Sequence, residues 1–302
     1  MTLKKRLVRP TILAHAYHSS PSGVIQIVPI EMSRLDIAGL SHAGNKRDRN
    51  EDSIGIDAQL GLVVLADGMG GYQGGQIASA LAVKVVIETI REHYSSAPEN
   101  VETKVGDDWH RSVLRQAFEK ANNVIYHLAR RKPQWQGMGT TLIAALFHDH
   151  RVTIGHVGDS RLYRVRNNEL QRVTADHSLL QELVDGGFCT AEDLRCSLNK
   201  NLITRAVGIA QSVEPAMKQE QVIPGDLYLL CSDGLTDLVD DQEIQLALRQ
   251  SFCELRKAAV SLVRLANHRG GHDNISVIVA RCAKTASTNM FHEPQPTHVS
   301  SE

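Results

Sequence analysis

The segment LVVLADGMGGYQGGQIASA (62–80) begins with an apolar run that ends at a single aspartate, and this junction constrains the fold strongly. Residues 62–66 are apolar without interruption and predict a strand. Six of the ten residues from Asp67 to Gln76 are Asp or Gly, and a helical pattern follows. So much glycine beside a carboxylate indicates a close approach to the backbone, and we expect the approaching group to be positively charged.

Two nucleotide-binding motifs fail at defining positions of this stretch. A dinucleotide-binding G-x-G-x-x-G fits Gly68 and Gly70, but Gln73 stands where the third glycine belongs. A phosphate-binding G-x-x-x-x-G-K-[ST] loop fits Gly70 and Gly75, but Gln-Ile follows in place of Lys and Ser or Thr. The remaining alternative is an ordinary strand-to-helix turn whose glycines supply positive φ angles.

Four other segments place a carboxylate beside Gly, Ser or Asn near the end of an expected strand. They are GNKRDRNEDS (44–53), VGDSRLY (157–163), LLCSDGL (229–235) and GGHDNIS (270–276). One such aspartate is usually a turn or cap residue, but five sites predict a cluster, which needs compensating cations. Oxygen ligands without a Cys/His set favour Mg²⁺ or Mn²⁺. Two such ions about 3.5–4 Å apart can deprotonate a bridging water and polarise a phosphate ester.

Arg47 precedes the carboxylates Glu51 and Asp52 by a few residues. A guanidinium could clamp phosphate oxygens as a bidentate fork. The alternative is a surface arginine that pairs with one of these two carboxylates.

The remaining patterns indicate one α+β domain with largely antiparallel sheets, because strand and helix candidates occur in runs. The expected strands are 35–41, 53–57, 62–66, 140–147, 151–157, 161–166, 227–231 and 275–281, and the expected helices are 76–92, 108–131, 177–186, 241–250 and 253–267. We expect this domain to span residues 34–283, with a weakly ordered extension over 1–33 and a flexible tail over 284–302. The segment 187–203 fits no element and could be a mobile flap.

Composition excludes several classes of protein. The net charge of −1 lacks the basic excess of a general nucleic-acid or anionic-membrane binder. Five cysteines without a CxxC argue against a disulfide framework or a structural zinc site and favour a reducing compartment. No apolar run approaches the roughly 18 residues of a membrane span. We therefore expect a cytoplasmic protein without nucleic-acid or membrane partners. We also expect it to act as a monomer, although composition does not bear on this point.

Taken in order, eight motifs resemble those of the metal-dependent protein phosphatases, the type 2C serine/threonine phosphatases. They are GNKRDRNEDS, LADGMGG, GTT (139–141), VGDSRLYR, TADHS (174–178), ITRAVG (203–208), CSDGL and HDN. The resemblance covers about residues 34–282. It implies a four-layer αββα sandwich, with two mainly antiparallel sheets flanked by helices and a metal site in a cleft at one end. Met69 stands where many eukaryotic members have a histidine, which indicates a bacterial member.

The same resemblance implies two Mn²⁺ or Mg²⁺ ions in each active site. Asp67 would bridge both ions, and the carbonyl group of Gly68 would reach one of them. Asp233 and Asp273 would hold the other ion.

Four further residues receive roles from the resemblance. Glu51 and Asp52 would bind the first ion or its waters, and Asp159 would build a third, weaker metal site in a bacterial member. Arg47 would hold the substrate phosphate.

The reaction would be attack of a metal-bridging hydroxide on phosphoserine or phosphothreonine, reversing the action of a serine/threonine kinase. Phosphorylated proteins, including such a kinase or its targets, are the expected partners, and Met69 leaves the general acid unassigned.

Three alternatives stay open beside this interpretation. A degenerate phosphatase used only for binding would have lost metal positions, which are intact here. A two-metal phosphodiesterase or nuclease is disfavoured by the net charge. A regulator acting on a phosphorylated anti-sigma-type switch protein would share the chemistry and differ only in substrate. A cysteine nucleophile of the C-x5-R type is excluded, since only Cys189 has an arginine at that spacing and the intervening TAEDL lacks glycine.

Several other polar residues near the motifs are assigned structural roles. We expect His177 to be a buried hydrogen-bonding residue and Arg161 to be an ion-pair partner. Thr140 and Thr141 are expected to pack and to form hydrogen bonds rather than to bind metal.

Overall fold

The computed structural model describes residues 14–19, 25–30, 35–71, 73–96, 108–188 and 202–283. Residues 35–283 form one compact unit, and the two ends of the chain belong to another. In that other unit, β1 (Ala14–Ser19) and β2 (Ile25–Ile30) pair antiparallel, within the segment predicted to be weakly ordered. The predicted tail (284–302) and most of the predicted flap (189–201) lie outside the described residues.

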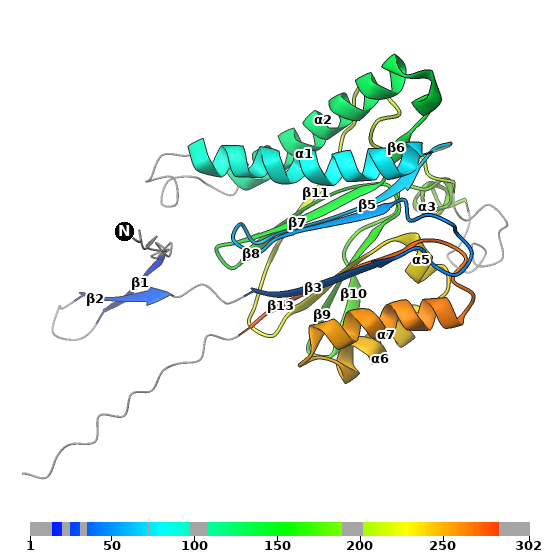
Figure 1. Ribbon diagram of the computed structural model, residues 1–302. Coiled ribbons are helices and arrows are strands. Elements are labelled where there is room, and N and C mark those ends of the chain that lie inside the picture. Colours follow the sequence, from blue (N-terminus) through cyan, green and yellow to red (C-terminus); the bar gives the residue numbers. More distant parts are fainter. Residues whose placement is uncertain are drawn as a thin grey trace, which may run out of the picture. The chain divides into compact units, whose positions relative to one another are not determined.

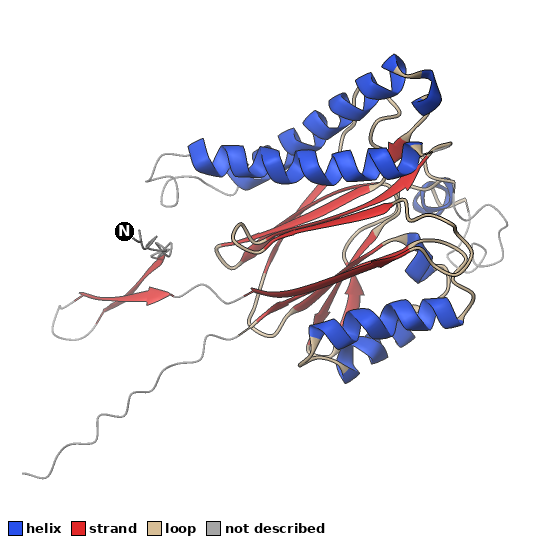
Figure 2. Cartoon of the chain, in the orientation of Figure 1, coloured by secondary structure: helices blue, strands red, loops and turns tan. Residues whose placement is uncertain are grey.

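Two antiparallel sheets lie face to face in the unit formed by residues 35–283 (Figures 1 and 2). The larger sheet has the order β11 (Ala216–Gln221), β8 (Arg151–Val157), β7 (Leu142–His148), β5 (Leu62–Met69), β4 (Asp52–Asp57), and β6 (Gly139–Thr140) pairs with β5. The smaller sheet has the order β10 (Glu169–Arg172), β9 (Arg161–Arg166), β12 (Leu227–Cys231), β13 (Ile275–Cys282), β3 (Leu35–His42).

Helices cover the outer face of each sheet and complete four layers (Figure 1). The larger sheet is covered by α1 (Gly74–Ser96) and α2 (Asp108–Arg131), and the smaller sheet by α6 (Asp241–Gln250) and α7 (Leu255–His268). Two short helices, α3 (Leu179–Asp185) and α5 (Asp233–Thr236), and the 3₁₀ turn η2 (Pro133–Trp135) complete the described elements. The expected αββα sandwich is thereby confirmed. Among the described residues, no helix has a stretch long and apolar enough to cross a lipid bilayer.

The apolar run at 62–66 is uninterrupted because both faces of β5 are buried. Leu62 and Val64 pack against the helices, and Val63 and Leu65 pack between the two sheets. Successive side chains of a strand point to opposite faces, so a strand in the inner layers of a four-layer sandwich needs apolar residues at every position. The same division holds for β13, whose alternate residues enter the core between the sheets and the core under α7.

The predicted helices and strands differ from the observed ones in two ways: some boundaries are misplaced, and some polar or short elements are missed. The predicted strand 140–147 is divided, since β6 ends at Thr140 and β7 begins at Leu142. The predicted helix 177–186 begins only at Leu179, because Ser178 is extended and its hydroxyl caps the helix by accepting from the Gln181 amide. The strands β10 and β11 and the helix α5 were not predicted. The strands are short, half-exposed and largely polar, which gives no clear apolar pattern.

Candidate metal centre

The start of β4, the end of β5, the end of β12 and the start of β13 meet at one end of the sandwich. This brings the predicted aspartates together. Asp52 is the first residue of β4 and lies directly opposite Asp67 of β5 in the antiparallel register. Asp233 opens α5 after β12, and Asp273 lies two residues before β13. A cleft of about 710 Å³ opens there, and its lining includes Arg47, Glu51, Asp67, Gly68, Asp233, Asp273 and Asn274.

Close backbone packing explains two of the glycines that follow Asp67, Gly68 and Gly75. A Cβ atom on Gly68 would overlap the carbonyl group of Gly75 and would lie 2.6 Å from the Glu51 carbonyl oxygen. A Cβ atom on Gly75 would lie 2.5 Å from the Glu51 carboxylate. The start of α1 therefore packs directly on the end of β5, and the missing side chains leave room for Glu51 at the cleft.

Asn274 holds the segment from Ala43 to Glu51 against the start of β13, and sequence analysis gave it no role of its own. Its side-chain oxygen accepts from the Glu51 amide at 2.8 Å. Its side-chain nitrogen donates to the carbonyl oxygens of Ala43 and Arg49, at 2.9 and 2.8 Å. Asn274 is the third residue of the HDN motif, so the motif includes it. Its role becomes apparent only in the folded chain, where the two segments that it joins lie side by side.

Two buried carboxylate oxygens in the centre lack a hydrogen-bond partner among the described residues. They are Oδ1 of Asp52 and Oδ1 of Asp233. The other oxygen of Asp52 accepts from the Ser232 hydroxyl at 2.9 Å, which fixes the orientation of this carboxylate. Buried unpaired oxygens in a group of aspartates are unfavourable unless a cation joins them. The donor set is therefore a good fit for hard divalent ions such as Mn²⁺ and Mg²⁺.

Burial and mutual repulsion raise the pKa values of the clustered carboxyl groups. The pKa of Asp233 rises to about 8, through burial and then the charges of Asp159 and Asp237. The pKa of Asp52 and that of Asp159 each rise to about 6, mainly through burial. Burial, followed by the charge of Asp52, also raises the pKa of Asp67. Without a cation, the folded protein therefore retains protons that the unfolded chain has lost at neutral pH.

This proton retention predicts how the stability of the metal-free protein depends on pH. Below about pH 4 an aspartate is protonated in both states, whereas between about pH 4 and 8 the unfolded chain loses the Asp233 proton and the folded protein keeps it. The Asp233 contribution to stability therefore falls as pH rises through this range. In EDTA, Asp233→Asn should become more stable than the wild type, with an advantage that grows from pH 5 to pH 8 to on the order of a few kcal/mol.

Urea unfolding of both proteins in EDTA at pH 5, 6.5 and 8 measures this difference. Comparing the two proteins cancels titrations elsewhere, such as that of His177, whose pKa burial lowers to about 4. Added Mn²⁺ should stabilise the wild type and not the variant. A difference that stays constant over the three pH values would contradict the assignment of Asp233 as a buried, repelled carboxylate.

Arg47 lies at the cleft, but it does not pair with Glu51 or Asp52, the two partners weighed from the sequence. Its guanidinium donates to the Asp273 carboxylate at 2.8 Å, and both side chains are substantially exposed. This ion pair, together with the charges of Glu51 and Asp233, raises the pKa of Arg47. Among the described residues that line the cleft, Arg47 and Arg49 are the cationic side chains, so Arg47 stands where an anion could approach beside the carboxylates.

Asp159 lies close enough to the centre to perturb it electrostatically but is not among the described residues that line the cleft. Its charge raises the pKa of Asp233 and of Asp67, and the side chain itself is buried. The neighbouring Arg161 pairs with Asp176 at 2.8 Å, as the sequence predicts for a structural ion-pair partner.

The remaining structural assignments are confirmed. The hydroxyl of Thr141 accepts from the Asp67 amide at 2.9 Å, and the hydroxyl of Thr140 donates to the Asp67 carbonyl oxygen at 2.8 Å. Both threonines thus position Asp67. His177 is buried, and its ring nitrogen accepts from the Gly158 amide at 3.2 Å.

The structure is thus a four-layer αββα sandwich with a carboxylate-lined cleft at one end, and the oxygen donors of that cleft suit divalent cations. Comparison with known proteins shows the family to which the chain belongs. The family model of protein phosphatase 2C matches residues 38–266. A crystal structure of the catalytic domain of the serine/threonine protein phosphatase PstP in complex with two manganese ions matches with a TM-score of 0.71 and 37% sequence identity, over 83% of this chain and 99% of that chain.

Two curated relatives show the extent of the similarity. The serine/threonine protein phosphatase PstP of Mycobacterium tuberculosis is 39% identical over 246 residues, which are 82% of this chain and 45% of that protein. The serine/threonine phosphatase stp of Listeria welshimeri is 37% identical over 241 residues, 78% of this chain and 91% of that protein. This chain thus spans less than half the length of the mycobacterial relative. The chain belongs to the protein phosphatase 2C family of metal-dependent serine/threonine phosphatases, and these relatives are bacterial, as Met69 led us to expect.

Proposed function

We propose that this chain hydrolyses phosphoserine and phosphothreonine in proteins at a binuclear Mn²⁺ or Mg²⁺ centre. The observation that carries the proposal is the group of aspartates at one end of the sandwich, where a buried oxygen of Asp52 and one of Asp233 lack a hydrogen-bond partner among the described residues and Arg47 lines the same cleft as Asp233. Glu51, Asp52, Asp67 and the Gly68 carbonyl would hold the ions together with Asp233 and Asp273. The manganese-bound PstP domain, at 37% identity, supports a two-metal centre.

When bound, two such ions would supply an ionised bridging water as nucleophile and would polarise the phosphate ester. The residues of the chain fix the geometry for this chemistry. The Asp67 amide donates to Thr141, and the Asp67 carbonyl oxygen accepts from Thr140. The carboxylate of Asp52 is oriented by the Ser232 hydroxyl. Such preorganised groups need no rearrangement as charge develops on the phosphate.

The ion pair between Arg47 and Asp273 would let the arginine change its partner when metal binds. Because Asp273 would turn its charge toward an ion once the centre is occupied, the guanidinium would be released to bind phosphate oxygens. Metal binding and phosphate binding would then be coupled through one exposed pair. The 57% exposed side chain of Arg47 has the freedom that this exchange requires.

Arg47→Ala should therefore raise the KM for a phosphothreonine peptide about tenfold, equivalent to roughly 1.4 kcal/mol, without weakening Mn²⁺ binding. Steady-state kinetics and Mn²⁺ titration of the same preparation measure both quantities. Arg91→Ala is a matched control, since Arg91 is also an exposed arginine that pairs with an aspartate, Asp57, at 2.7 Å. An unchanged KM together with weaker Mn²⁺ binding would show that Arg47 supports the metal site instead.

The choice of substrate separates a phosphatase from a phosphodiesterase built on a similar centre. With Mn²⁺ present, we expect phosphate release from phosphoserine and phosphothreonine peptides to exceed hydrolysis of bis(p-nitrophenyl) phosphate by at least ~100-fold in kcat/KM, a difference of about 3 kcal/mol. Preferential cleavage of the diester would contradict the proposed function while leaving the metal centre intact.

Three finer features belong to the same proposal. Asp159, through its proximity to Asp233, would contribute to a third, weaker metal site. The substrates would be phosphorylated proteins of the cytoplasm, including a serine/threonine kinase or its targets, and the chain would act as a monomer. The unpaired thiols of Cys231, Cys253 and Cys282 are consistent with a reducing compartment.

A further inference from the structure

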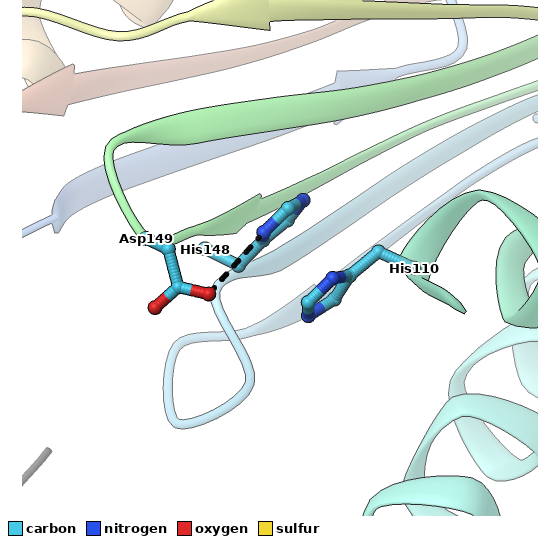
Figure 3. Close-up of side chains that lie close together, drawn as sticks. All are labelled: His110, His148 and Asp149. Atoms are coloured by element: carbon cyan, nitrogen blue, oxygen red, sulfur yellow. Dashed lines mark ion pairs between the residues drawn. The ribbon is translucent and has the colours of Figure 1, made fainter. Parts of the chain in front are cut away.

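A second group of metal-ligating side chains lies at the end of the sandwich opposite the proposed catalytic centre. It consists of His110, His148 and Asp149, whose candidate ligand atoms all lie within 4.8 Å of one another (Figure 3). Thr141, which contacts Asp67, precedes β7, whereas His148 is the last residue of that strand. Six strand steps of about 3.3 Å each separate the two ends of β7 by roughly 20 Å. The group is therefore distinct from the catalytic centre.

Two neighbouring structural elements hold the group together. Asp149 lies in the two-residue turn between β7 and β8, where Asp149 and His150 have φ angles of 39° and 60°. Two successive residues with positive φ are typical of a tight hairpin turn, so the backbone fixes the position of Asp149 relative to His148. His110 belongs to the first turn of α2, and Figure 3 shows its ring on the side of the helix that faces this hairpin.

The strongest sign of a missing ligand is a buried ring nitrogen of His148 that makes no hydrogen bond to any described residue. The side chain is only 8% exposed, yet its Nδ1 atom has no hydrogen-bond partner among the described residues. An oxygen of Asp149 lies 3.8 Å away, which makes an ion pair with a protonated imidazole but is too long for a hydrogen bond (Figure 3). A buried nitrogen left in this state is unfavourable, and an ion between the imidazole and the carboxylate would satisfy both groups.

The other ring nitrogen of His148 is anchored as in known histidine ligands. Its Nε2 atom lies 2.8 Å from the Thr153 hydroxyl, which can accept a hydrogen bond from the Nε2–H group. That contact would leave the lone pair of Nδ1 directed at the group, since a metal-binding histidine commonly donates its other N–H to an outer partner. Thr153 thus orients the ring without itself binding the ion.

His110 would supply the third ligand after its ring rotates out of its present stack on His148. Its ring now stacks on His148, with ring centroids 3.5 Å apart and an angle of 9° between the planes. Parallel rings do not point their nitrogen lone pairs at one atom, so the stack must open for both to bind. His110 is only half-buried, which permits that rotation. Ligand atoms in a tetrahedral site with bonds of about 2.0 Å lie about 3.3 Å apart, so the contraction needed is modest.

We propose that His110, His148 and Asp149 form an accessory site for a borderline divalent ion, with Zn²⁺ as the best match. Two imidazoles and one carboxylate favour Zn²⁺ and its neighbours, whereas the all-oxygen catalytic centre favours harder ions. A water molecule or a second carboxylate oxygen fills the fourth position. The ion connects the start of α2 to the β7–β8 hairpin, so its effect is on stability and not on the reaction.

Titration of the 302-residue chain with Zn²⁺ in saturating Mg²⁺ tests this site. We expect the wild type to bind one more Zn²⁺ ion per chain than His110→Gln or Asp149→Asn does. Loss of either ligand should lower the affinity for that Zn²⁺ ion by more than the roughly 10–100-fold that loss of an outer hydrogen-bond partner costs. Asparagine readily adopts positive φ, so Asp149→Asn preserves the turn. The matched control is His127→Gln, which changes an exposed histidine on the same helix.

Thermal unfolding under the same conditions gives a second, independent readout. Zn²⁺ should raise the Tm of the wild type and of His127→Gln, with no further increase over Mg²⁺ alone in His110→Gln or Asp149→Asn. Equal Zn²⁺ stoichiometry, affinity and Tm shift in all four proteins would overturn the proposal. Absence of Zn²⁺ binding to the wild type outside the catalytic centre would overturn it as well. Neither result depends on whether the catalytic centre hydrolyses phosphopeptides.

Discussion

Asp67→Asn should abolish metal-dependent phosphatase activity, with a loss of at least ~10³-fold in kcat/KM, or about 4 kcal/mol at the transition state. Thr140 and Thr141 both form hydrogen bonds with the backbone of Asp67, and Asp52 lies directly opposite Asp67 in the strand register. Asparagine keeps the size of the side chain but removes the charge needed to hold two cations close together. Hydrolysis of a phosphothreonine peptide over a range of Mn²⁺ concentrations measures the loss.

Asp57→Asn is the control for this substitution. Asp57 is also a buried aspartate, and it lies at the other end of β4, where it pairs with Arg91. That variant should lose some stability through its broken ion pair and keep its Mn²⁺-dependent activity. If Asp67→Asn kept more than a tenth of the wild-type activity at ordinary Mn²⁺ concentrations, Asp67 could not be the shared ligand of two ions.

Gly68→Ala should be the most damaging single-methyl substitution in the glycine-rich segment. The added carbon would overlap the carbonyl group of Gly75 and come within 2.6 Å of the Glu51 carbonyl oxygen, and both are backbone groups that cannot rotate away. Forcing the start of α1 away from β5 should cost about 3 kcal/mol of folding free energy. Because the same displacement moves Glu51 and the Gly68 carbonyl, Mn²⁺ affinity should fall by at least ~100-fold, or roughly 2.7 kcal/mol.

Gly71→Ala is a matched control three residues away. A Cβ atom on Gly71 would meet nothing within 4 Å, and its backbone has no positive φ angle. Its stability should change by no more than about 0.5 kcal/mol, with activity unchanged. Urea unfolding and Mn²⁺ titration distinguish the two variants. Equal effects at both positions would mean that the glycines provide general flexibility and not a close backbone contact.

Much of the fold could be predicted from the sequence because both inner sheets produce strong patterns. The run at 62–66 is unbroken since β5 is buried on both faces, and the helix predicted over 108–131 has the observed bounds of α2. Polar, half-exposed β10 and β11 carry no such pattern. Their positions depend on pairing with β9 and β8, which is a tertiary contact that local sequence does not encode.

The site shows the same division between local and long-range information. Each aspartate could be found from its strand end, and the family resemblance assigned the metal positions. The partner of Arg47 could not be found, because Asp273 is 226 residues away in the chain. Asn274 and Ser232 act through segments that meet only in the folded protein. Residues that position ligands are thus less visible in a sequence than the ligands themselves.

Phosphate release from a phosphothreonine peptide, measured first in EDTA and then after Mn²⁺ is restored, tests the central claim most directly. The proposed function predicts no release in EDTA, recovery with Mn²⁺, and no recovery in Asp67→Asn under the same conditions. Hydrolysis that persists in EDTA would contradict a metal-dependent mechanism. Absence of release from several phosphopeptides despite saturated Mn²⁺ binding would contradict the proposed catalytic activity and would indicate a metal-binding recognition module.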